Sequence, residues 1–250
     1  MNAAPQPTPY IPYHRNPYFT GREDILHYLY THLHITDNTK EVSSYALSGL
    51  GGIGKTQTII EYAYRYAQEY SAVFWIGAES HESRIASLQR IAECLRLPEE
   101  QECHKMIAAV INWLNSHRNW LLLVDNIEDI DMVKAFLPSM RQGSLLLTTR
   151  LQTMGGLAHM IELGRLSLDE GVQLLQRYSR HLLPSLDAEQ IPSAELQAAQ
   201  MLVEQMEGLP LAIEHAGAYI EETHCSISDF LHLFHEYPLE LLKNLPPDNG

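Results

Sequence analysis

The sequence contains few cysteines and little positive charge. Its three cysteines, Cys94, Cys103 and Cys225, are odd in number and far apart, which argues against a disulfide framework. The pair Cys103-His104 has no second cluster at a zinc-like spacing. The 17 Lys and Arg residues stand against 31 Asp and Glu residues, giving a formal net charge of −14. This charge disfavours sequence-independent binding to nucleic acid or to anionic lipid.

Long apolar runs are also missing, and the first residues lack the composition of a leader segment. No stretch approaches the roughly 20 apolar residues that cross a bilayer. Residues 1–18 have neither a basic start nor an apolar centre, so they do not resemble a signal peptide. Apolar residues nonetheless make up 45% of the 250 residues, enough for a sizeable core. We expect a cytoplasmic protein that does not enter the membrane.

Three segments of different composition follow one another. Residues 1–18 hold five prolines, which predicts an extended linker or arm. Residues 19–164 alternate apolar strands with helical periodicity, which predicts a three-layer α/β domain with a mostly parallel sheet. Its five expected strands are 42–48, 72–76, 120–125, 144–149 and 159–163, and its expected helices include a short one near 132–137. Residues 165–250 show only helical stripes and predict a small all-α domain.

The glycine-rich stretch Gly49–Thr56 (GLGGIGKT) has the spacing of a phosphate-binding loop, or P-loop. An apolar strand precedes it and a helix follows it, as the mechanism requires. Glycines let backbone N–H groups turn inward around an anion, and the helix beginning near Lys55 adds its positive end. Lys55 is expected to reach the β- and γ-phosphates, and the Thr56 hydroxyl to bind Mg²⁺. The expected phosphate ligands are Gly51, Gly52, Ile53, Gly54, Lys55 and Thr56.

Two further side chains lie at or just after the ends of apolar strands. Asp125 ends WLLLVD, and an acid at the carboxyl end of a parallel strand faces the ligand crevice. It is the expected second Mg²⁺ anchor, with a helix N-cap as the structural alternative. Arg150 follows SLLLTT and could contact a γ-phosphate; a solvated loop arginine is an equally simple interpretation.

The motifs together resemble a known family. Phe19–Glu23 (FTGRE), the P-loop, Leu122–Asn126 (LLVDN), Leu147–Arg150 (LTTR) and Gly208–Ala212 (GLPLA) occur in that order. This set is similar to the NB-ARC nucleotide-binding module of the STAND signalling ATPases, whose members include plant disease-resistance proteins, the apoptosome scaffold and bacterial regulators. The resemblance runs from about residue 17 to about residue 235, and it implies a P-loop NTPase fold.

The resemblance also implies roles for single residues. Thr20 and Arg22 match positions that hold the adenine base, and Pro210 matches a proline that packs on it. Arg150 matches the sensor arginine. By their position after the loop, Gln57 and Thr58 are expected beside the α-phosphate.

One departure from the family concerns hydrolysis. Many relatives carry a second acid directly after the metal-binding Asp, but here that residue is Asn126, which cannot act as a general base. Glu128 and Asp129 lie close in sequence, and the spacing alone leaves open whether either replaces it. We therefore expect at most a weak ATPase, with Lys55, Asp125 and Arg150 as its catalytic residues.

The second departure concerns length. Relatives usually continue into a winged-helix domain, sensor repeats and an effector, so we expect this chain to be a fragment of a longer protein. The predicted function is an ADP/ATP switch, closed with ADP and able to form a homo-oligomer with ATP. Three alternatives stay open at this point: a conventional P-loop ATPase or kinase, a passive interaction module with a structural nucleotide, and, disfavoured by charge, a nucleic-acid ATPase.

Overall fold

The computed structural model describes residues 9–33, 43–98, 102–131, 143–179 and 193–236. The helix expected near 132–137 lies outside these residues. The chain divides into two compact units. The first contains residues 1–16, 22–51 and 55–163, and the second contains residues 17–21, 52–54 and 164–250.

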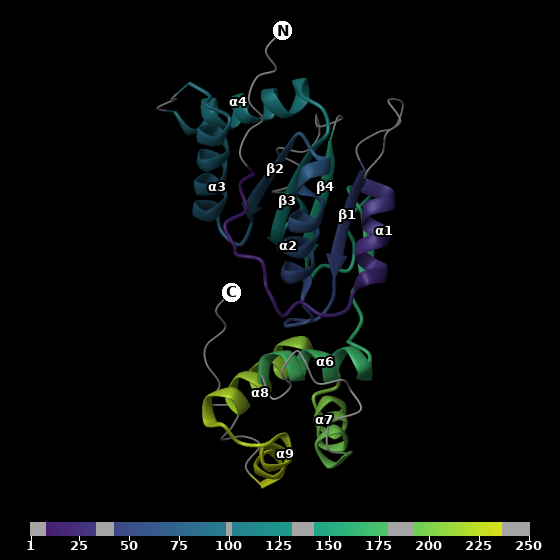
Figure 1. Ribbon diagram of the computed structural model, residues 1–250. Coiled ribbons are helices and arrows are strands. Elements are labelled where there is room, and N and C mark those ends of the chain that lie inside the picture. Colours follow the sequence, from purple (N-terminus) through teal and green to yellow (C-terminus); the bar gives the residue numbers. More distant parts are fainter. Residues whose placement is uncertain (1–8, 34–42, 99–101, 132–142, 180–192, 237–250) are drawn as a thin grey trace. The chain divides into compact units, whose positions relative to one another are not determined.

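A five-stranded parallel sheet forms the centre of the first unit (Figure 1). Its strands run in the order β2-β3-β4-β1-β5, and every pairing is parallel. The strands are β1 Ser43–Ser48, β2 Ala72–Gly77, β3 Trp120–Ile127, β4 Ser144–Thr149 and β5 His159–Glu162. The predicted parallel five-stranded sheet is thus confirmed, although β3 runs two residues beyond the expected end at Asp125 because it continues past a bulge next to β4.

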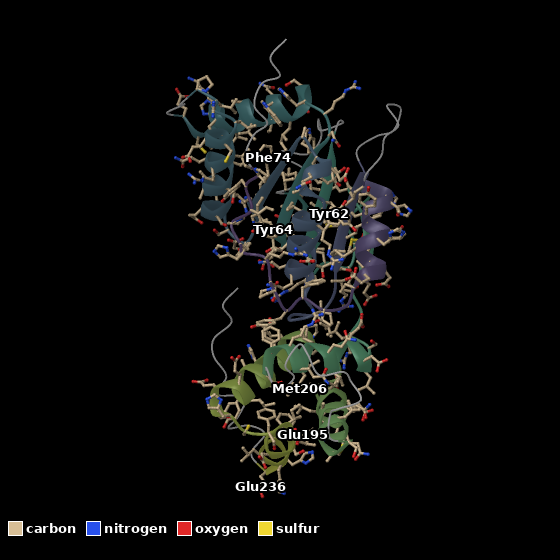
Figure 2. All side chains as sticks on the ribbon, in the orientation of Figure 1. Tyr62, Tyr64, Phe74, Glu195, Met206 and Glu236 are labelled. Atoms are coloured by element: carbon tan, nitrogen blue, oxygen red, sulfur yellow. The ribbon has the colours of Figure 1, made fainter. Side chains whose placement is uncertain are left out.

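Alternate residues of the central strands face opposite sides of the sheet. On one side Phe74, Leu122 and Leu145 pack in a core (Figure 2 labels Phe74). The helices α3 (His81–Cys94) and α4 (Cys103–Ser116) contribute to this core. By the same alternation Asp125 and Thr148 belong to the opposite side, which α1 (Glu23–Leu33) and α2 (Lys55–Tyr66) cover.

The N-terminal segment 9–16 lies on the first unit. The Tyr10 N–H donates to the carbonyl of Val73 on β2 at 2.9 Å. The Tyr13 ring meets Trp75 edge-on, with centroids 5.0 Å apart, and the Tyr13 carbonyl accepts from the Tyr64 hydroxyl. This segment therefore pairs with the free edge of β2 and shields its apolar side chains.

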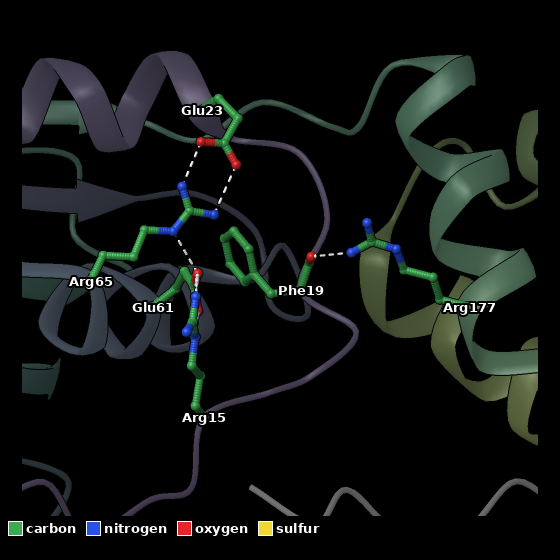
Figure 3. Close-up of polar contacts among 6 residues, drawn as sticks. All are labelled: Arg15, Phe19, Glu23, Glu61, Arg65 and Arg177. Carbon is green, nitrogen blue, oxygen red and sulfur yellow. Dashed lines mark hydrogen bonds and ion pairs between the residues drawn. The ribbon is translucent and has the colours of Figure 1, made fainter. Parts of the chain in front are cut away.

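An ion-pair network fixes the same segment to α2 (Figure 3). Arg15 donates to both oxygens of Glu61 at 2.9 and 2.8 Å, and Arg65 donates to Glu61 and to Glu23. The Glu61 side chain is only 3% exposed. Burial by itself raises the pKa of Glu61, but the hydrogen bonds from Arg15 and Arg65 outweigh it and hold that pKa below its usual value.

The described residues of the second unit form four helices, which agrees with the predicted all-α character of this part of the chain. They are α6 Leu168–Ser179, α7 Ser193–Gln205, α8 Pro210–Thr223 and α9 Ile227–Glu236. Leu175, Leu202, Ile213 and Phe230 meet in their common core. In Figure 3 the Arg177 guanidinium of α6 donates to the Phe19 carbonyl at 2.6 Å, which ties residues 17–21 to this unit.

Candidate nucleotide-binding site

The glycine loop connects the end of β1 at Ser48 to the start of α2 at Lys55. Gly52 and Gly54 have φ angles of +73° and +91°, in the region that side chains with a Cβ rarely adopt. A loop of this conformation, followed directly by a helix N-terminus, presents backbone N–H groups to an anion. The local sequence therefore forms a glycine loop followed directly by a helix, and phosphate binding by this loop stays a prediction.

Lys55 extends its side chain back over this loop. Its Nζ donates to the carbonyls of Gly49 and Leu50, both at 2.9 Å. Burial lowers the pKa of Lys55, the nearby Arg150 lowers it further, and Asp125 partly opposes them. A partly desolvated cation beside a second cation gains strongly from a polyanionic ligand.

Three polar side chains meet on the α2 side of the sheet. Asp125 Oδ1 accepts from the Thr56 hydroxyl at 2.9 Å and from the Thr148 hydroxyl at 2.5 Å. Thr148 Oγ1 in turn accepts from the Asn126 N–H at 2.8 Å. Burial raises the pKa of Asp125, and the two hydroxyl donors reduce that rise. We call Thr56, Asp125 and Thr148 the strand-end triad.

The donor set of the triad fits a magnesium ion. Mg²⁺ prefers hard oxygen ligands and is commonly held by one or two protein oxygens together with phosphate oxygens and water. The Thr56 hydroxyl and the Asp125 carboxylate lie side by side at the start of α2, and a cation there would offset the cost of keeping a buried carboxylate charged. These two side chains could hold the ion, with Thr148 orienting the carboxylate.

Arg150 and the first turn of α2 both belong to the first unit. Arg150 is exposed just after β4, and its Nη2 lies 4.0 Å from where a Cβ on Gly51 would be. Gln57 is exposed, whereas Thr58 is buried at 1% exposure.

The residues expected around the base are divided between the two units. Arg22 belongs to the first, with φ +66° at the start of α1. Thr20 and Pro210 belong to the second. The Thr20 hydroxyl donates to the Tyr18 carbonyl at 2.8 Å, and Pro210 occupies the first position of α8.

Residues 52–54 of the loop are also grouped with the second unit, and Ile53 among them is buried at 1% exposure. Within this unit the Leu211 N–H donates to the Gly52 carbonyl at 3.2 Å, and a Cβ on Gly52 would lie 2.9 Å from Leu211 Cβ. The backbone of Gly52 therefore approaches the α8 N-terminus more closely than a side chain would allow.

Comparison with known proteins identifies the family. The family model described as the NB-ARC domain matches residues 22–182. The chain belongs to the NB-ARC family. As an NB-ARC domain it is a nucleotide-binding module, which agrees with the P-loop and the strand-end triad. No helix in the described part of this NB-ARC chain is both long and apolar enough to cross a membrane.

Relatives of this NB-ARC chain are much longer proteins. It is 28% identical over 245 residues to a nucleotide-binding leucine-rich repeat (NLR)-like protein of Hyaloscypha variabilis, covering 90% of this chain and 24% of that protein. It is 26% identical over 214 residues to the regulatory protein AfsR of Streptomyces griseus, covering 81% and 21%. The chain thus spans about a quarter of the length of these relatives.

Among solved structures, the ORC1 protein of Aeropyrum pernix, determined in complex with DNA, has a TM-score of 0.56. The match covers 92% of this chain and 69% of that one at 16% identity. At this identity the likeness concerns the fold alone.

The sequence interpretation missed Thr148 of the triad. The strand SLLLTT and the motif LTTR contain Thr148 but assign it no role, yet it is buried at 1% exposure and bonded to Asp125. The sequence did contain a signal for this role: a hydroxyl side chain near the end of a buried parallel strand needs a polar partner at the same sheet edge. Finding that partner required knowing that β4 lies next to β3.

Proposed function

We propose that this NB-ARC module is an adenine-nucleotide switch that binds ADP tightly, hydrolyses ATP slowly and keeps the ADP product. The observation that carries the proposal is the strand-end triad beside the P-loop, where Thr56 and Thr148 both donate to the buried Asp125. This arrangement supplies a metal and phosphate site, while Asn126 stands where a general base is often found.

Each group has a defined task in this proposal. The loop N–H groups at Gly51–Gly54 and the Lys55 ammonium hold the phosphates. Thr56 and Asp125 hold Mg²⁺, which when bound would neutralise charge on the β- and γ-phosphate oxygens. Gln57 and Thr58, in the first turn of α2, lie beside the α-phosphate, and Arg150 senses the γ-phosphate.

The family resemblance assigns binding of the adenine ring to three residues. Thr20 and Arg22 contact the adenine, and Pro210 packs a rigid apolar ring against it. The first residue of a helix has no intrahelical partner for its N–H, so a proline is tolerated there. Its rigid ring offers a flat apolar surface.

Switching requires different contacts in the two nucleotide states. Arg150, Lys55 and the metal ligands are the groups that touch a γ-phosphate, so they supply the free-energy difference between ATP and ADP. In the longer protein the ADP form would be closed, and the ATP form would open and oligomerise. Winged-helix, sensor and effector domains and a cytoplasmic location belong to the same proposal.

Single-turnover kinetics test this proposal. The purified chain is emptied of nucleotide, loaded with limiting ATP and Mg²⁺, and sampled for ADP formation and for ADP release. We expect one slow turnover, well below about 1 per second, and release of ADP that is slower still.

Two results would contradict the proposal. Steady turnover at about 1 per second or faster, or phosphoryl transfer to an acceptor, would indicate a conventional P-loop ATPase or kinase. Tight nucleotide binding with no hydrolysis, and with equal affinity for ADP and a non-hydrolysable ATP analogue, would indicate a passive module.

A further inference from the structure

Glu79 stands two residues beyond the end of β2, at the same sheet edge as Asp125. Gly77, the last residue of β2, pairs in register with Asp125 of β3, and the Ala78 N–H donates to the Asp125 carbonyl at 2.8 Å. Neighbouring strands in a sheet are about 4.8 Å apart. Glu79 therefore follows the strand directly beside the proposed metal ligand.

Gly77, the last residue of β2, faces the triad's side of the sheet, and the Glu79 carboxylate lies next to it. Phe74, Ile76 and Ala78 belong to the core on the α3 and α4 side. Residues of odd number point to the other side, where Trp75 meets Tyr13. The Glu79 carboxylate lies over Gly77 on this side, because a Cβ on Gly77 would be 2.8 Å from Glu79 Oε2.

The carboxylate is held in place and remains accessible. The Ser83 hydroxyl donates to Glu79 Oε1, and Ser83 is fixed in the first turn of α3, where its N–H donates to the N-cap Ser80 at 3.0 Å. Glu79 itself is exposed to solvent. Burial is the main cause of the raised pKa of Asp125, and the Glu79 carboxylate raises that pKa further.

The acids that follow Asp125 in sequence, Glu128 and Asp129, lie beyond the end of β3. Asp129 Oδ1 accepts from the Asp131 N–H at 2.9 Å, so it closes its own turn. Glu128 is exposed after the end of β3. Asn126 adopts φ +60° and commits its N–H to Thr148.

From this placement we propose that Glu79 is the general base for ATP hydrolysis, in place of the acid that is missing at position 126. This inference rests on the proposed slow hydrolysis and names the residue that carries it. The Glu79 carboxylate takes one proton from the attacking water, whose oxygen forms a bond to the γ-phosphorus. The bond from that phosphorus to the bridging oxygen breaks, its electron pair stays with ADP, and Glu79 passes the proton to the released phosphate or to solvent.

The test compares Glu79→Gln with the unmodified chain in single-turnover hydrolysis. A general base contributes about 100-fold or more, so Glu79→Gln is expected to slow hydrolysis by about that factor. Its Kd values for Mg²⁺-ADP and for a non-hydrolysable ATP analogue should stay within about threefold, because the phosphate and metal ligands are unchanged. Purified Glu79→Gln should also carry more ATP relative to ADP than the unmodified chain does.

Glu128→Gln and Asp129→Asn are the matched controls, and both are expected to hydrolyse ATP at the unmodified rate. Glu79→Asp keeps the charge but shortens the reach, so it should also lose most of the rate. Ser83→Ala should reduce the rate less than Glu79→Gln and leave both Kd values unchanged, which is the result for a positioning residue.

The outcomes separate the two proposals. Hydrolysis by Glu79→Gln at the unmodified rate, or its loss in Glu128→Gln or Asp129→Asn instead, would overturn the role of Glu79 and leave the switch standing. Absence of hydrolysis in the unmodified chain would overturn both.

Discussion

The buried Thr148 hydroxyl holds two neighbouring groups of the strand-end triad region in place. It donates to Asp125 and accepts from the Asn126 N–H, so it fixes both the carboxylate and the backbone that follows it. A buried polar group left without its partner costs about 1–3 kcal/mol. The shape of the site therefore depends on a residue that need not touch the nucleotide.

We predict that Thr148→Val destabilises the chain by about 1–3 kcal/mol. Valine keeps the shape but removes the hydroxyl, leaving the Asn126 N–H without its acceptor. Because the Asp125 carboxylate loses an orienting donor, the affinity for Mg²⁺-ADP should fall by about tenfold. Urea denaturation and calorimetric titration measure the two effects.

Thr223→Val is the matched control, because its hydroxyl donates to the Tyr219 carbonyl at an exposed position. It should change neither quantity appreciably. A Thr148→Val variant as stable as Thr223→Val would contradict the importance given to the triad.

At the scale of elements, the N-terminal segment acts as part of the first unit. Arg15 pairs with Glu61, whose side chain is 3% exposed, while Tyr10 hydrogen-bonds to the edge strand β2. Such an arrangement covers an unpaired strand edge, a feature that proteins commonly protect.

We predict that Arg15→Ala lowers the free energy of unfolding by about 1 kcal/mol at pH 7. The Glu61 pKa is lowered in the folded state, so ionised Glu61 contributes stability above its ordinary pKa and loses it as the pH falls through the folded value. The difference between variant and unmodified chain should therefore shrink below about pH 4.5. Urea midpoints at pH 7, 5 and 4 measure it.

The control for Arg15 is Arg90→Ala, which breaks the exposed pair of Arg90 with Glu93. Exposed pairs contribute about 0–1 kcal/mol, so this variant should be nearly neutral. Equal effects of the two substitutions, or a difference independent of pH, would argue against the described role of Arg15.

In the second unit, α6 and α8 cross closely at Gly217. A Cβ there would lie 2.5 Å from Tyr178 Cβ and 3.3 Å from the Leu175 carbonyl oxygen. Gly217→Ala should therefore destabilise the unit by about 1–2 kcal/mol, since overpacking outweighs the better helix propensity of alanine. Circular dichroism during urea denaturation measures the change.

Gly164→Ala provides the comparison for Gly217, because nothing lies within 4 Å of a Cβ at that position. It is expected to stay within about 0.5 kcal/mol of the unmodified chain. A Gly217→Ala variant with an unchanged free energy of unfolding would show that α6 and α8 move apart more readily than their close packing indicates.

Local sequence patterns predicted most helices and strands, but they did not predict which elements lie next to one another in space. The five strands, the loop and Asp125 could be read from apolar runs and glycine spacing because those signals are short in sequence. The pairings of Thr148 with Asp125 and of Arg15 with Glu61 span 23 and 46 residues. They depend on which strand lies beside which, and no local pattern carries that order.

At the scale of the whole molecule, the chain contains an NB-ARC nucleotide-binding module and consists of an α/β unit and a helical unit. A ligand that binds the folded state but not the unfolded state stabilises the fold, by about 2.7 kcal/mol when its concentration is 100 times its Kd. Nucleotide should thus be both the signal and a large part of the stability of this module.

The most direct measurement is the nucleotide that copurifies with the chain, identified by chromatography after denaturation. We predict near-stoichiometric ADP in the unmodified protein and its loss in Lys55→Ala, with circular dichroism showing that the variant is folded. Lys55 lies over the loop and donates to Gly49 and Leu50, so its removal deletes the main cation of the phosphate site. Folded Lys55→Ala that retains ADP at the unmodified level would contradict the assignment of this loop as the nucleotide site.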